Sequence, residues 1–381
     1  MMRRCFSVGI VAVILTCAAC HRNGVVEIPE IDSVVESIDT VPRTSITFIL
    51  GKDHNSYNQY YTLANYYYRL NPDERTEIVV DNLKSLSQVL EYLRTHPTDN
   101  NRPYGLVNLV THGNEFIDLQ MTIKPYGSRT SASSLRRAIA DSVIVPLDSS
   151  IVDSQTIIYL HGCAVGNNTE LLEQLAQAFG GDYGVTVKAS KLFEYYAYLT
   201  QNKNPQSIHH YFAKPWYAFY SPDSVPDNKA LIKQLKMRYP HDTANWQEGL
   251  MRRFQGNPSE IYHYSFEVPC TYEHLGISPE KLQEAISASN RQQWAAKHTS
   301  LRSLMAKTHI PSQYFQIKLY QQTYITDNDS IAYGLKVRAK AGVICLLQPL
   351  TTTDSLGNRF MPYIPKDSIA FGYAVAKGRK M

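Results

Sequence analysis

The segment Gly105–Gly113 reads Gly-Leu-Val-Asn-Leu-Val-Thr-His-Gly, and the segment Gln155–Cys163 reads Gln-Thr-Ile-Ile-Tyr-Leu-His-Gly-Cys. Both are short runs rich in apolar and β-branched residues, the composition of strands that are buried on both faces. Each run leads into a histidine followed by a glycine, and in the second the glycine precedes a cysteine. The sequence therefore predicts two buried strands, Gly105–Thr111 and Gln155–Leu160, with polar residues at their ends.

The segments around these two strands alternate between strand and helix patterns. Further strands are expected at Ser45–Leu50, Thr76–Val80 and Gly184–Ala189, and helices at Asn58–Leu70, Leu83–Thr95, Ser134–Ala140 and Thr169–Phe179. Strands that alternate with helices require crossover connections, which predicts an α/β fold with three layers and a mostly parallel sheet. Ligands bind beyond the carboxyl ends of the strands in such sheets, and both His112 and Cys163 stand there.

The pattern changes beyond Tyr220. Helices are expected at Asp227–Tyr239 and within Pro279–Lys307, and alternating antiparallel strands at Tyr262–Val268, Tyr314–Tyr324, Ile331–Ala339 and Val343–Leu347. A chain of 381 residues suits two domains. We therefore expect a first domain at residues 44–222 and a smaller α+β region at residues 223–381, which could shape or cover a groove.

The N-terminal residues have the pattern of a leader followed by a tether. Two arginines precede the apolar run Val8–Leu15, and small residues then lead to Ala18-Ala19-Cys20. This pattern resembles a bacterial lipoprotein signal peptide. The resemblance implies that residues 1–19 are removed, that Cys20 carries lipid, and that residues 20–43 tether the protein to a membrane of the bacterial cell envelope, in the periplasm or at the cell surface. A cleaved secretory signal without lipid, or an uncleaved anchor, is the alternative.

Charge and cysteine content exclude two other classes of protein. The formal charge of +4 becomes +2 (36 minus 34) if the leader is removed, and no basic stripe is present, so we expect no nucleic-acid partner. The cysteines that then remain besides Cys20 are Cys163, Cys270 and Cys345, an odd and widely spaced set that does not suggest a disulfide framework. An isolated thiol in an exported protein calls for a specific explanation, and Cys163 has a suggestive position.

His112 and Cys163 fit the requirements of cysteine-based acyl transfer. That chemistry needs a thiolate, an imidazole that takes its proton, and backbone N–H groups where the oxyanion forms. The two residues end strong strands and are 51 residues apart (163 minus 112), and the N–H groups of Gly113 and Cys163 are candidate oxyanion donors. The helix that begins near Thr169 is expected to lower the pKa of the thiol. Two structural residues at strand ends are the alternative.

An apolar strand, His-Gly, about fifty residues, a second apolar strand and Gly-Cys before a small loop together resemble the clan CD cysteine peptidases, which include caspases, gingipains, clostripain-like enzymes and CHAT domains. The resemblance covers about residues 44–220. It implies a caspase-like fold, His112 as general base or acid, Cys163 as nucleophile, Gly113 as oxyanion donor, protein or peptide substrates, and no cofactor. The caspase sequence Gln-Ala-Cys is missing, so aspartate specificity is not implied.

Several residues near the expected site are candidates for binding substrate or metal. Ala189, Ser190 and Lys191 end the strand that follows the nucleophile and are candidate substrate-binding residues, with an ordinary strand end as the alternative. His161 shares a strand face with Cys163, so it could pair with the thiol or, together with His112, bind a metal. No fourth ligand with recognisable spacing is present, so we expect no metal, and expect His161 to pack or hydrogen-bond near the site.

The sequence thus favours a lipid-anchored cysteine endopeptidase. The alternative is an inactive caspase-fold lipoprotein that acts as a binding or scaffold protein, and a less favoured one is a CHAT-type effector that a partner activates. The chain also has 27 tyrosines, with clusters at residues 60–68, 195–198 and 216–220. Their rings could line a binding groove, although half-buried strand and helix faces are the more ordinary explanation.

Overall fold

The computed structural model describes residues 43–54, 59–70, 78–98, 101–199, 207–253, 260–288, 291–325, 331–357 and 360–376. All of these belong to one compact unit, Pro42–Met381. The expected signal peptide, Cys20 and the tether up to residue 42 lie outside the described residues. Within the described ranges, no helix is both long enough and apolar enough to cross a membrane.

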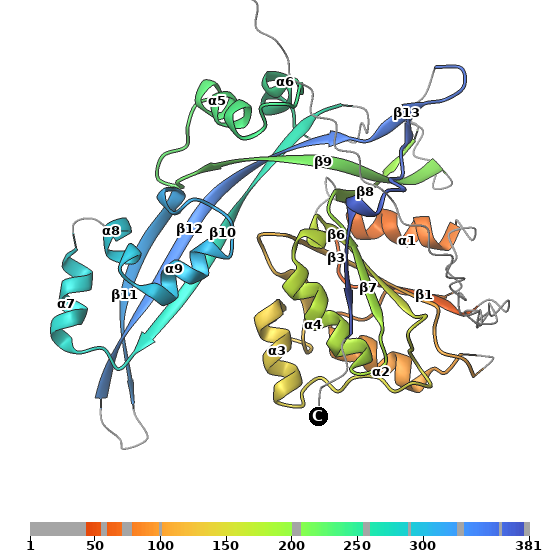
Figure 1. The fold of residues 1–381 in the computed structure, drawn as a ribbon, viewed down its shortest axis with the longest axis horizontal. Helices are drawn as coiled ribbons and strands as arrows, with labels where there is room; N and C mark the ends of the chain where they lie inside the picture. Colours follow the sequence, from red (N-terminus) through yellow and green to blue (C-terminus); the bar gives the residue numbers. More distant parts are fainter. Residues whose placement is uncertain are drawn as a thin grey trace, which may run out of the picture. The chain divides into compact units, whose positions relative to one another are not determined.

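A six-stranded sheet combines five strands from the first half of the chain with one strand near its C-terminus (Figure 1), in the order β15-β7-β6-β3-β1-β2. Its strands are β1 (Ser45–Ile49), β2 (Ile78–Val80), β3 (Leu106–Asn114), β6 (Ile157–Cys163), β7 (Thr186–Ser190) and β15 (Phe371–Val375). The pairs from β2 to β7 are parallel, and β15 runs antiparallel to β7 at the edge. The expected α/β fold with a mostly parallel sheet is therefore confirmed.

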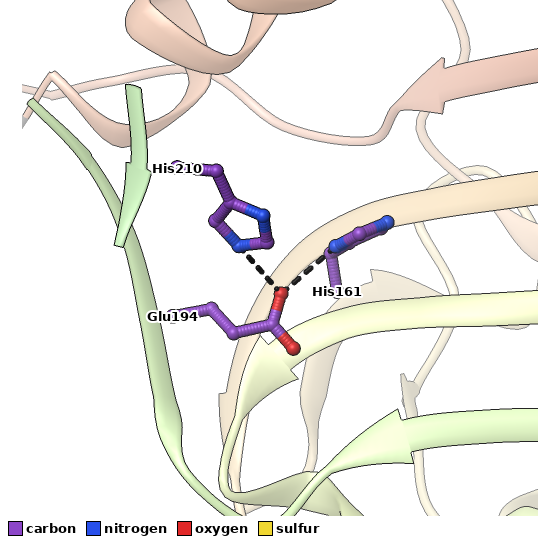
Figure 2. Close-up of side chains that lie close together, drawn as sticks. All are labelled: His161, Glu194 and His210. Carbon is purple, nitrogen blue, oxygen red and sulfur yellow. Dashed lines mark hydrogen bonds and ion pairs between the residues drawn. The ribbon is translucent and has the colours of Figure 1, made fainter. Parts of the chain in front are cut away.

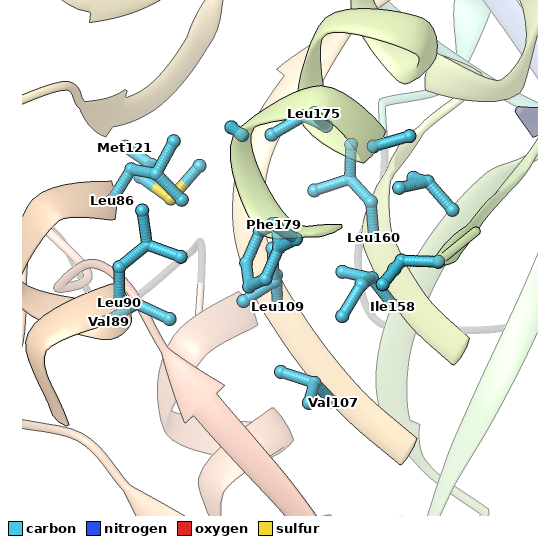
Figure 3. Packing of buried hydrophobic residues seen from close by; sticks show 14 of the residues in the cluster. Leu86, Val89, Leu90, Val107, Leu109, Met121, Ile158, Leu160, Leu175 and Phe179 are labelled. Carbon is cyan, nitrogen blue, oxygen red and sulfur yellow. The ribbon is translucent and has the colours of Figure 1, made fainter. Parts of the chain in front are cut away.

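Helices cover both faces of this sheet, namely α1 (Tyr60–Leu70), α2 (Leu86–Thr95), α3 (Ala132–Ala140) and α4 (Thr169–Gly180). Side chains alternate along a strand, so Leu109 and Leu160 pack with α2 and α4, whereas Val110 packs with α1. Figure 3 shows the α2 and α4 side, where Leu90 and Phe179 converge on β3 and β6. The first sheet is therefore buried on both faces, as its apolar strands predict.

Capping side chains set where the helices begin. Ser85 accepts a hydrogen bond from the N–H of Gln88, so α2 begins at Leu86 rather than at the expected Leu83. Asn168 caps α4 in the same way through the N–H of Leu171, so this helix begins at Thr169 as expected.

A second, antiparallel sheet has the strand order β10-β12-β9-β8, and β11 also pairs with β12. Its strands are β8 (Phe193–Tyr198), β9 (Ile208–Tyr220), β10 (Tyr262–Leu275), β11 (Phe315–Ile325) and β12 (Ile331–Pro349). On one face, α5 (Asn228–Arg238) and α6 (Trp246–Met251) pack against Trp216 and Leu346. The opposite face packs against α7 (Pro279–Ser287), α8 (Arg291–Ala296) and α9 (Thr299–Ala306), as Figure 1 shows.

Short elements complete the described chain. β4 (Leu119–Thr122) pairs with β5 (Arg129–Thr130), and β13 (Thr351–Thr353) pairs with β14 (Phe360–Pro362). Three single turns of 3-10 helix are η2 (Val165–Asn167), η4 (Ser312–Tyr314) and η5 (Ser368–Ala370).

The two sheets exchange strands along the chain. β8 and β9 precede residue 222 but belong to the second sheet, and β15 follows it but belongs to the first. The sheets also share a core, because Phe116 and Cys163 pack against the apolar face that contains Phe193 and Tyr217. The domain boundary expected near residue 222 stays a prediction, and each sheet draws strands from both sides of it.

Candidate functional site

His112 and Cys163 lie at the carboxyl-terminal edge of the first sheet, on neighbouring parallel strands. β3 and β6 pair in register up to Val110 opposite His161, and the register then shifts before Asn114 pairs with Cys163. His112 therefore lies in the irregular stretch of β3, beside the end of β6. The structure brings both residues to one edge, although each strand continues through its His-Gly pair instead of ending before it.

The imidazole of His112 is enclosed by two tyrosines of α1. The ring of Tyr60 stacks on it with centroids 4.6 Å apart, and the ring of Tyr61 meets it edge-on at 4.7 Å. The hydroxyl of Tyr61 also accepts a hydrogen bond of 2.9 Å from the backbone N–H of His112. Burial lowers the pKa of His112 to about 4, so the ring is neutral at neutral pH. A neutral imidazole can accept a proton, as a general base must.

The thiol of Cys163 is bonded to a backbone carbonyl. Its Sγ donates to the carbonyl oxygen of Glu194 at 3.5 Å, and the residue packs against the apolar face of the second sheet. Burial raises the pKa of Cys163 to about 12, which is opposite to the lowering expected from the start of α4. Among the described residues, no hydrogen bond joins this thiol to His112. The two expected catalytic groups are thus neighbours in the sheet, and the thiol is protonated.

Tyr60 contacts the surroundings of both residues. Its ring stacks on His112, and its hydroxyl donates a hydrogen bond of 3.2 Å to the carbonyl of His161, two residues before Cys163. The pKa of Tyr60 is raised by burial first and then by electrostatic interaction with Cys163 and Glu194. The first turn of α1 therefore fills the space next to the imidazole and reaches the end of β6.

The chain turns sharply after Cys163. Ala164 has φ 55° and ψ 18°, in the left-handed region that non-glycine residues rarely adopt. The N–H of Ala164 donates to the carbonyl of Leu192 at 2.8 Å, which ties this turn to the segment before β8. Gly113, the other expected oxyanion donor, is buried on β3. The strained backbone at Ala164 thus lies directly beside the thiol.

The three candidate substrate-binding residues lie where β15 joins the sheet. Ala189 and Ser190 are fully buried, and they pair with Gly372 and Phe371 of β15. Lys191 is half-buried, and its N–H donates to the carbonyl of Ala370 at 2.8 Å. The backbone of this strand end is therefore paired with the chain's own C-terminal strand.

A buried cluster of three ionisable side chains lies beside the same edge. It consists of His161 from β6, Glu194 from β8 and His210 from β9, and we call it the His–Glu–His cluster (Figure 2). His161 Nδ1 lies 2.8 Å and His210 Nε2 lies 3.0 Å from the same oxygen, Glu194 Oε2. The three side chains are 4%, 0% and 9% exposed, respectively. The cluster therefore connects the first sheet to the second.

Polar side chains form a second ring around the His–Glu–His cluster. His161 Nε2 lies 3.1 Å from Asn108 Oδ1 and 2.9 Å from the hydroxyl oxygen of Tyr68. The hydroxyl of Tyr159 donates to Glu194 Oε1 at 3.5 Å. These contacts hold the first imidazole and the carboxylate in fixed orientations.

Aromatic rings close the cluster off from solvent. Tyr159 stacks on His161 with centroids 4.0 Å apart, and Tyr196 stacks on His210 at 4.8 Å. Five tyrosines of the clusters seen in the sequence share one buried core, namely Tyr60, Tyr61, Tyr67, Tyr68 and Tyr196. These rings form interior walls rather than an exposed groove.

Glu194 is ionised in spite of its burial. Burial alone would raise its pKa, but the positive charge of His161 and the hydrogen bonds from both imidazoles outweigh that effect and lower the pKa to about 2. Burial lowers the pKa of His161 at the same time, so the two buried groups oppose each other in their protonation. The backbone carbonyl of the same residue accepts the hydrogen bond from the thiol of Cys163. One residue of β8 therefore joins the His–Glu–His cluster to the expected nucleophile.

Sequence reasoning named His161 but missed Glu194 and His210. Their strands read Phe-Glu-Tyr-Tyr-Ala-Tyr and Ile-His-His-Tyr-Phe-Ala, which are aromatic and histidine-rich rather than plainly apolar. A glutamate inside such an aromatic strand is a usable signal, because glutamate is almost never fully buried unless it is paired.

Comparison of the chain with protein-family models, curated proteins and solved structures finds no match. Its function must therefore be inferred from the chemistry of the site itself.

Proposed function

We propose that this protein is a cysteine endopeptidase in which Cys163 is the nucleophile and His112 the general base, with proteins or peptides as substrates. One observation carries the proposal: His112 and Cys163 come from neighbouring parallel strands and lie at the carboxyl edge of one sheet. Ligands bind at that edge in open parallel sheets. The clan CD peptidases, which the sequence resembles, use a histidine and a cysteine in this relation.

The lowered pKa of His112 keeps its imidazole neutral but makes it a weak base. Its pKa of about 4 leaves the imidazole neutral and able to take a proton. In the proposed reaction, the thiol proton passes to His112 while sulfur attacks the peptide carbonyl carbon, and the N–H groups of Gly113 and Cys163 stabilise the oxyanion. The amine then leaves with that proton, and water hydrolyses the thioester.

The observed arrangement corresponds to a resting form in this proposal. The Cys163 thiol is bonded to the Glu194 carbonyl, and burial holds its pKa near 12. Turnover requires the thiol to leave that carbonyl and meet His112, whose ring is stacked on Tyr60. Substrate binding at the edge would supply the free energy for this change.

The same observations favour a second candidate function. A thiol with a raised pKa in apolar surroundings is typical of a structural cysteine, not of a nucleophile. The alternative is therefore an inactive caspase-fold protein that binds other proteins or serves as a scaffold.

The proposed location is the bacterial cell envelope, with a lipid on Cys20 as membrane anchor. Its support is the leader pattern alone, because residues 1–42 lie outside the described residues. Radiolabelled fatty acid fed to cells that express the full chain should label the wild type and not Cys20→Ala.

Labelling with a peptide that carries a thiol-reactive acyloxymethyl ketone distinguishes the peptidase function from the scaffold function. Wild-type protein should be labelled at one site, and both Cys163→Ala and His112→Ala should lose the label. Cys270→Ala is the matched control, because this free cysteine is buried, whereas Cys163 is half-buried, and it lies in β10 of the second sheet. Equal labelling of wild type and Cys163→Ala, or no labelling with a library that varies the residue before the cut, would contradict the peptidase proposal.

A further inference from the structure

The His–Glu–His cluster has the donor atoms of a transition-metal site. Two imidazole nitrogens and one carboxylate oxygen lie within 4.8 Å of one another, and all three residues are buried. Zinc binds such nitrogen and oxygen ligands at about 2.0 to 2.2 Å, which separates two ligand atoms of a tetrahedral ion by about 3.3 Å. The observed separations from Glu194 Oε2 are 2.8 and 3.0 Å. Both separations are therefore a few tenths of an ångström shorter than those around a bound ion.

The hydrogen bonds of Asn108 favour a proton on Nε2 of His161. Asn108 Nδ2 donates to Thr47 Oγ1 at 3.0 Å, which turns the amide oxygen toward His161. That oxygen lies 3.1 Å from His161 Nε2 and can only accept, so it favours a proton on Nε2, whereas the Tyr68 hydroxyl, 2.9 Å from the same nitrogen, can either accept that proton or donate its own. In a neutral ring with the proton on Nε2, the nitrogen Nδ1 carries a lone pair that faces the carboxylate oxygen of Glu194.

When the proton of the neutral ring is on Nε2, His161 Nδ1 and Glu194 Oε2 are two acceptors in contact, and they require a positive charge between them. His161 Nδ1 and Glu194 Oε2 are 2.8 Å apart in a place closed to solvent. Either a second proton on His161 or a metal ion bound by both atoms removes the repulsion. Metal-binding histidines usually donate their other N–H to a carbonyl or carboxylate oxygen, which is the arrangement of His161 with Asn108.

No other cation neutralises the buried carboxylate directly. Among the described residues, the ion pairs of Glu194 are those with His161 and His210. Lys188 lies over the ring of Phe371, with Nζ 4.0 Å from its centroid, and makes no ion pair with Glu194. A buried charge is costly unless it is paired or coordinates a metal.

From these contacts we propose that His161, Glu194 and His210 bind one divalent transition-metal ion of the zinc class, with Glu194 Oε1 or a water as fourth ligand. The ion joins β6 of the first sheet to β8 and β9 of the second. Its role is structural, because aromatic rings enclose the three ligands. The ligand set differs from the pairing of His161 with His112 considered from the sequence, and the proposal does not depend on peptidase activity.

Metal uptake by the wild-type protein is the first test. Protein without a histidine tag is stripped with a chelator, and Zn²⁺ is added in competition with a chromophoric chelator. We expect one ion per chain and a higher thermal midpoint with Zn²⁺ than with the chelator. With Co²⁺ as probe, we expect the visible bands of a tetrahedral site with nitrogen and oxygen ligands, and no thiolate charge-transfer band. No uptake, or a thiolate band, overturns the proposal and leaves a proton between His161 and Glu194.

Substitutions locate the ion. His210→Gln should weaken binding at least about 100-fold, and Asn108→Ala, in the outer ring, about 10- to 100-fold. His209→Gln is the matched control on the neighbouring position of β9, and Cys163→Ala is the control for the thiol; both should bind as the wild type does. Unchanged binding in a folded His210→Gln contradicts the proposal. If that variant does not fold, the Co²⁺ spectrum of the wild type still decides between ligand sets.

Discussion

Glu194→Gln removes the buried charge of the His–Glu–His cluster and keeps the shape of the side chain. The pKa of Glu194 is about 2 in the folded protein, against an ordinary value of 4.5. Each tenfold step in the proton affinity is worth about 1.4 kcal/mol, so folding favours the ionised form by about 3 kcal/mol. Glutamine resembles the protonated form, so the variant should lose about that much free energy of unfolding at neutral pH.

Urea unfolding followed by tryptophan fluorescence measures this loss, with a chelator present so that no bound ion contributes. Trp216, Trp246 and Trp294 all pack in the cores of the second sheet and report on its unfolding. The thermal midpoint should fall by about 4 °C for a compact unit of this length. Glu170→Gln is the matched control, because Glu170 pairs with Arg136 at the surface with 41% of its side chain exposed. Such a pair contributes about 0 to 1 kcal/mol.

The pH dependence gives the sharper test of the charge. The folded pKa of Glu194 is lowered, so its contribution is fully present above pH 4.5 and disappears as pH falls toward 2. The difference in free energy of unfolding between wild type and Glu194→Gln should therefore shrink from about 3 kcal/mol at pH 6 toward zero near pH 2. A difference below about 0.5 kcal/mol at pH 7, or one that does not change down to pH 3, would refute an ionised buried Glu194.

Four further predictions concern the edge of the first sheet. Because burial raises the pKa of Cys163 to about 12 from 9.0, iodoacetamide should alkylate it about 1000-fold more slowly at pH 7.5 than an ordinary cysteine, measured by mass spectrometry; rapid alkylation would contradict the buried thiol. Tyr60→Ala should raise the alkylation rate of Cys163 and lower the free energy of unfolding by about 3 to 5 kcal/mol. Tyr60→Phe keeps the stacking on His112 and loses only the hydroxyl, so it should lower the free energy of unfolding by about 1 kcal/mol. Equal alkylation rates in both variants would exclude a role for the ring. The lowered pKa of His112 means that wild-type stability is full above pH 6.5 and falls by about 3 kcal/mol toward pH 4, and His112→Gln should remove this part of the acid sensitivity in urea titrations. A Cβ at Gly372 would overlap Gly166 O, so Gly372→Ala should speed hydrogen exchange in β15 and β7 relative to wild type, and unchanged exchange would argue against that close approach.

The first sheet was predictable because its strands are continuous apolar runs. β1, β3, β6 and β7 agree with the expected segments to within a few residues, and α4 begins at the expected Thr169. The expected ends of β3 and β6 were placed too early, because pairing continues through polar residues as far as Asn114 and Cys163. In the sequence, the strand ends were placed at the first polar residues. In the structure, each strand ends where hydrogen bonding to the neighbouring strand ends.

Elements defined by distant pairing were not predictable. β15 pairs with β7, about 180 residues earlier in the chain, and although Phe371, Tyr373 and Val375 favour a strand, nothing in its five residues indicates that partner. The expected strands Ile331–Ala339 and Val343–Leu347 are one strand, β12, because Gly342 lies within it as a packing position: a Cβ there would overlap the ring of Tyr220. A glycine in a sequence suggests a break in a strand, and only the neighbouring ring of Tyr220 in the structure explains why Gly342 lies within β12.

Some features of the candidate site were likewise predictable from the sequence, and others were not. The relation of His112 to Cys163 followed from strand order, which local patterns reveal. The surroundings of the thiol could not be predicted from local patterns. The pKa of Cys163 depends on burial against the second sheet rather than on the helix that follows it. Glu194 and His210 come from β8 and β9, and only the antiparallel pairing of these strands brings them to His161.

The exchange of strands between the sheets has a consequence for how the chain responds to a protease. A single cut near residue 222 would leave the C-terminal piece paired along Gly342–Pro349 with β9 and along Phe371–Val375 with β7. The two pieces would therefore stay associated as a nicked molecule that migrates as one species in its native state and as two bands after denaturation. In this architecture, breaking the backbone and releasing a fragment are separate events.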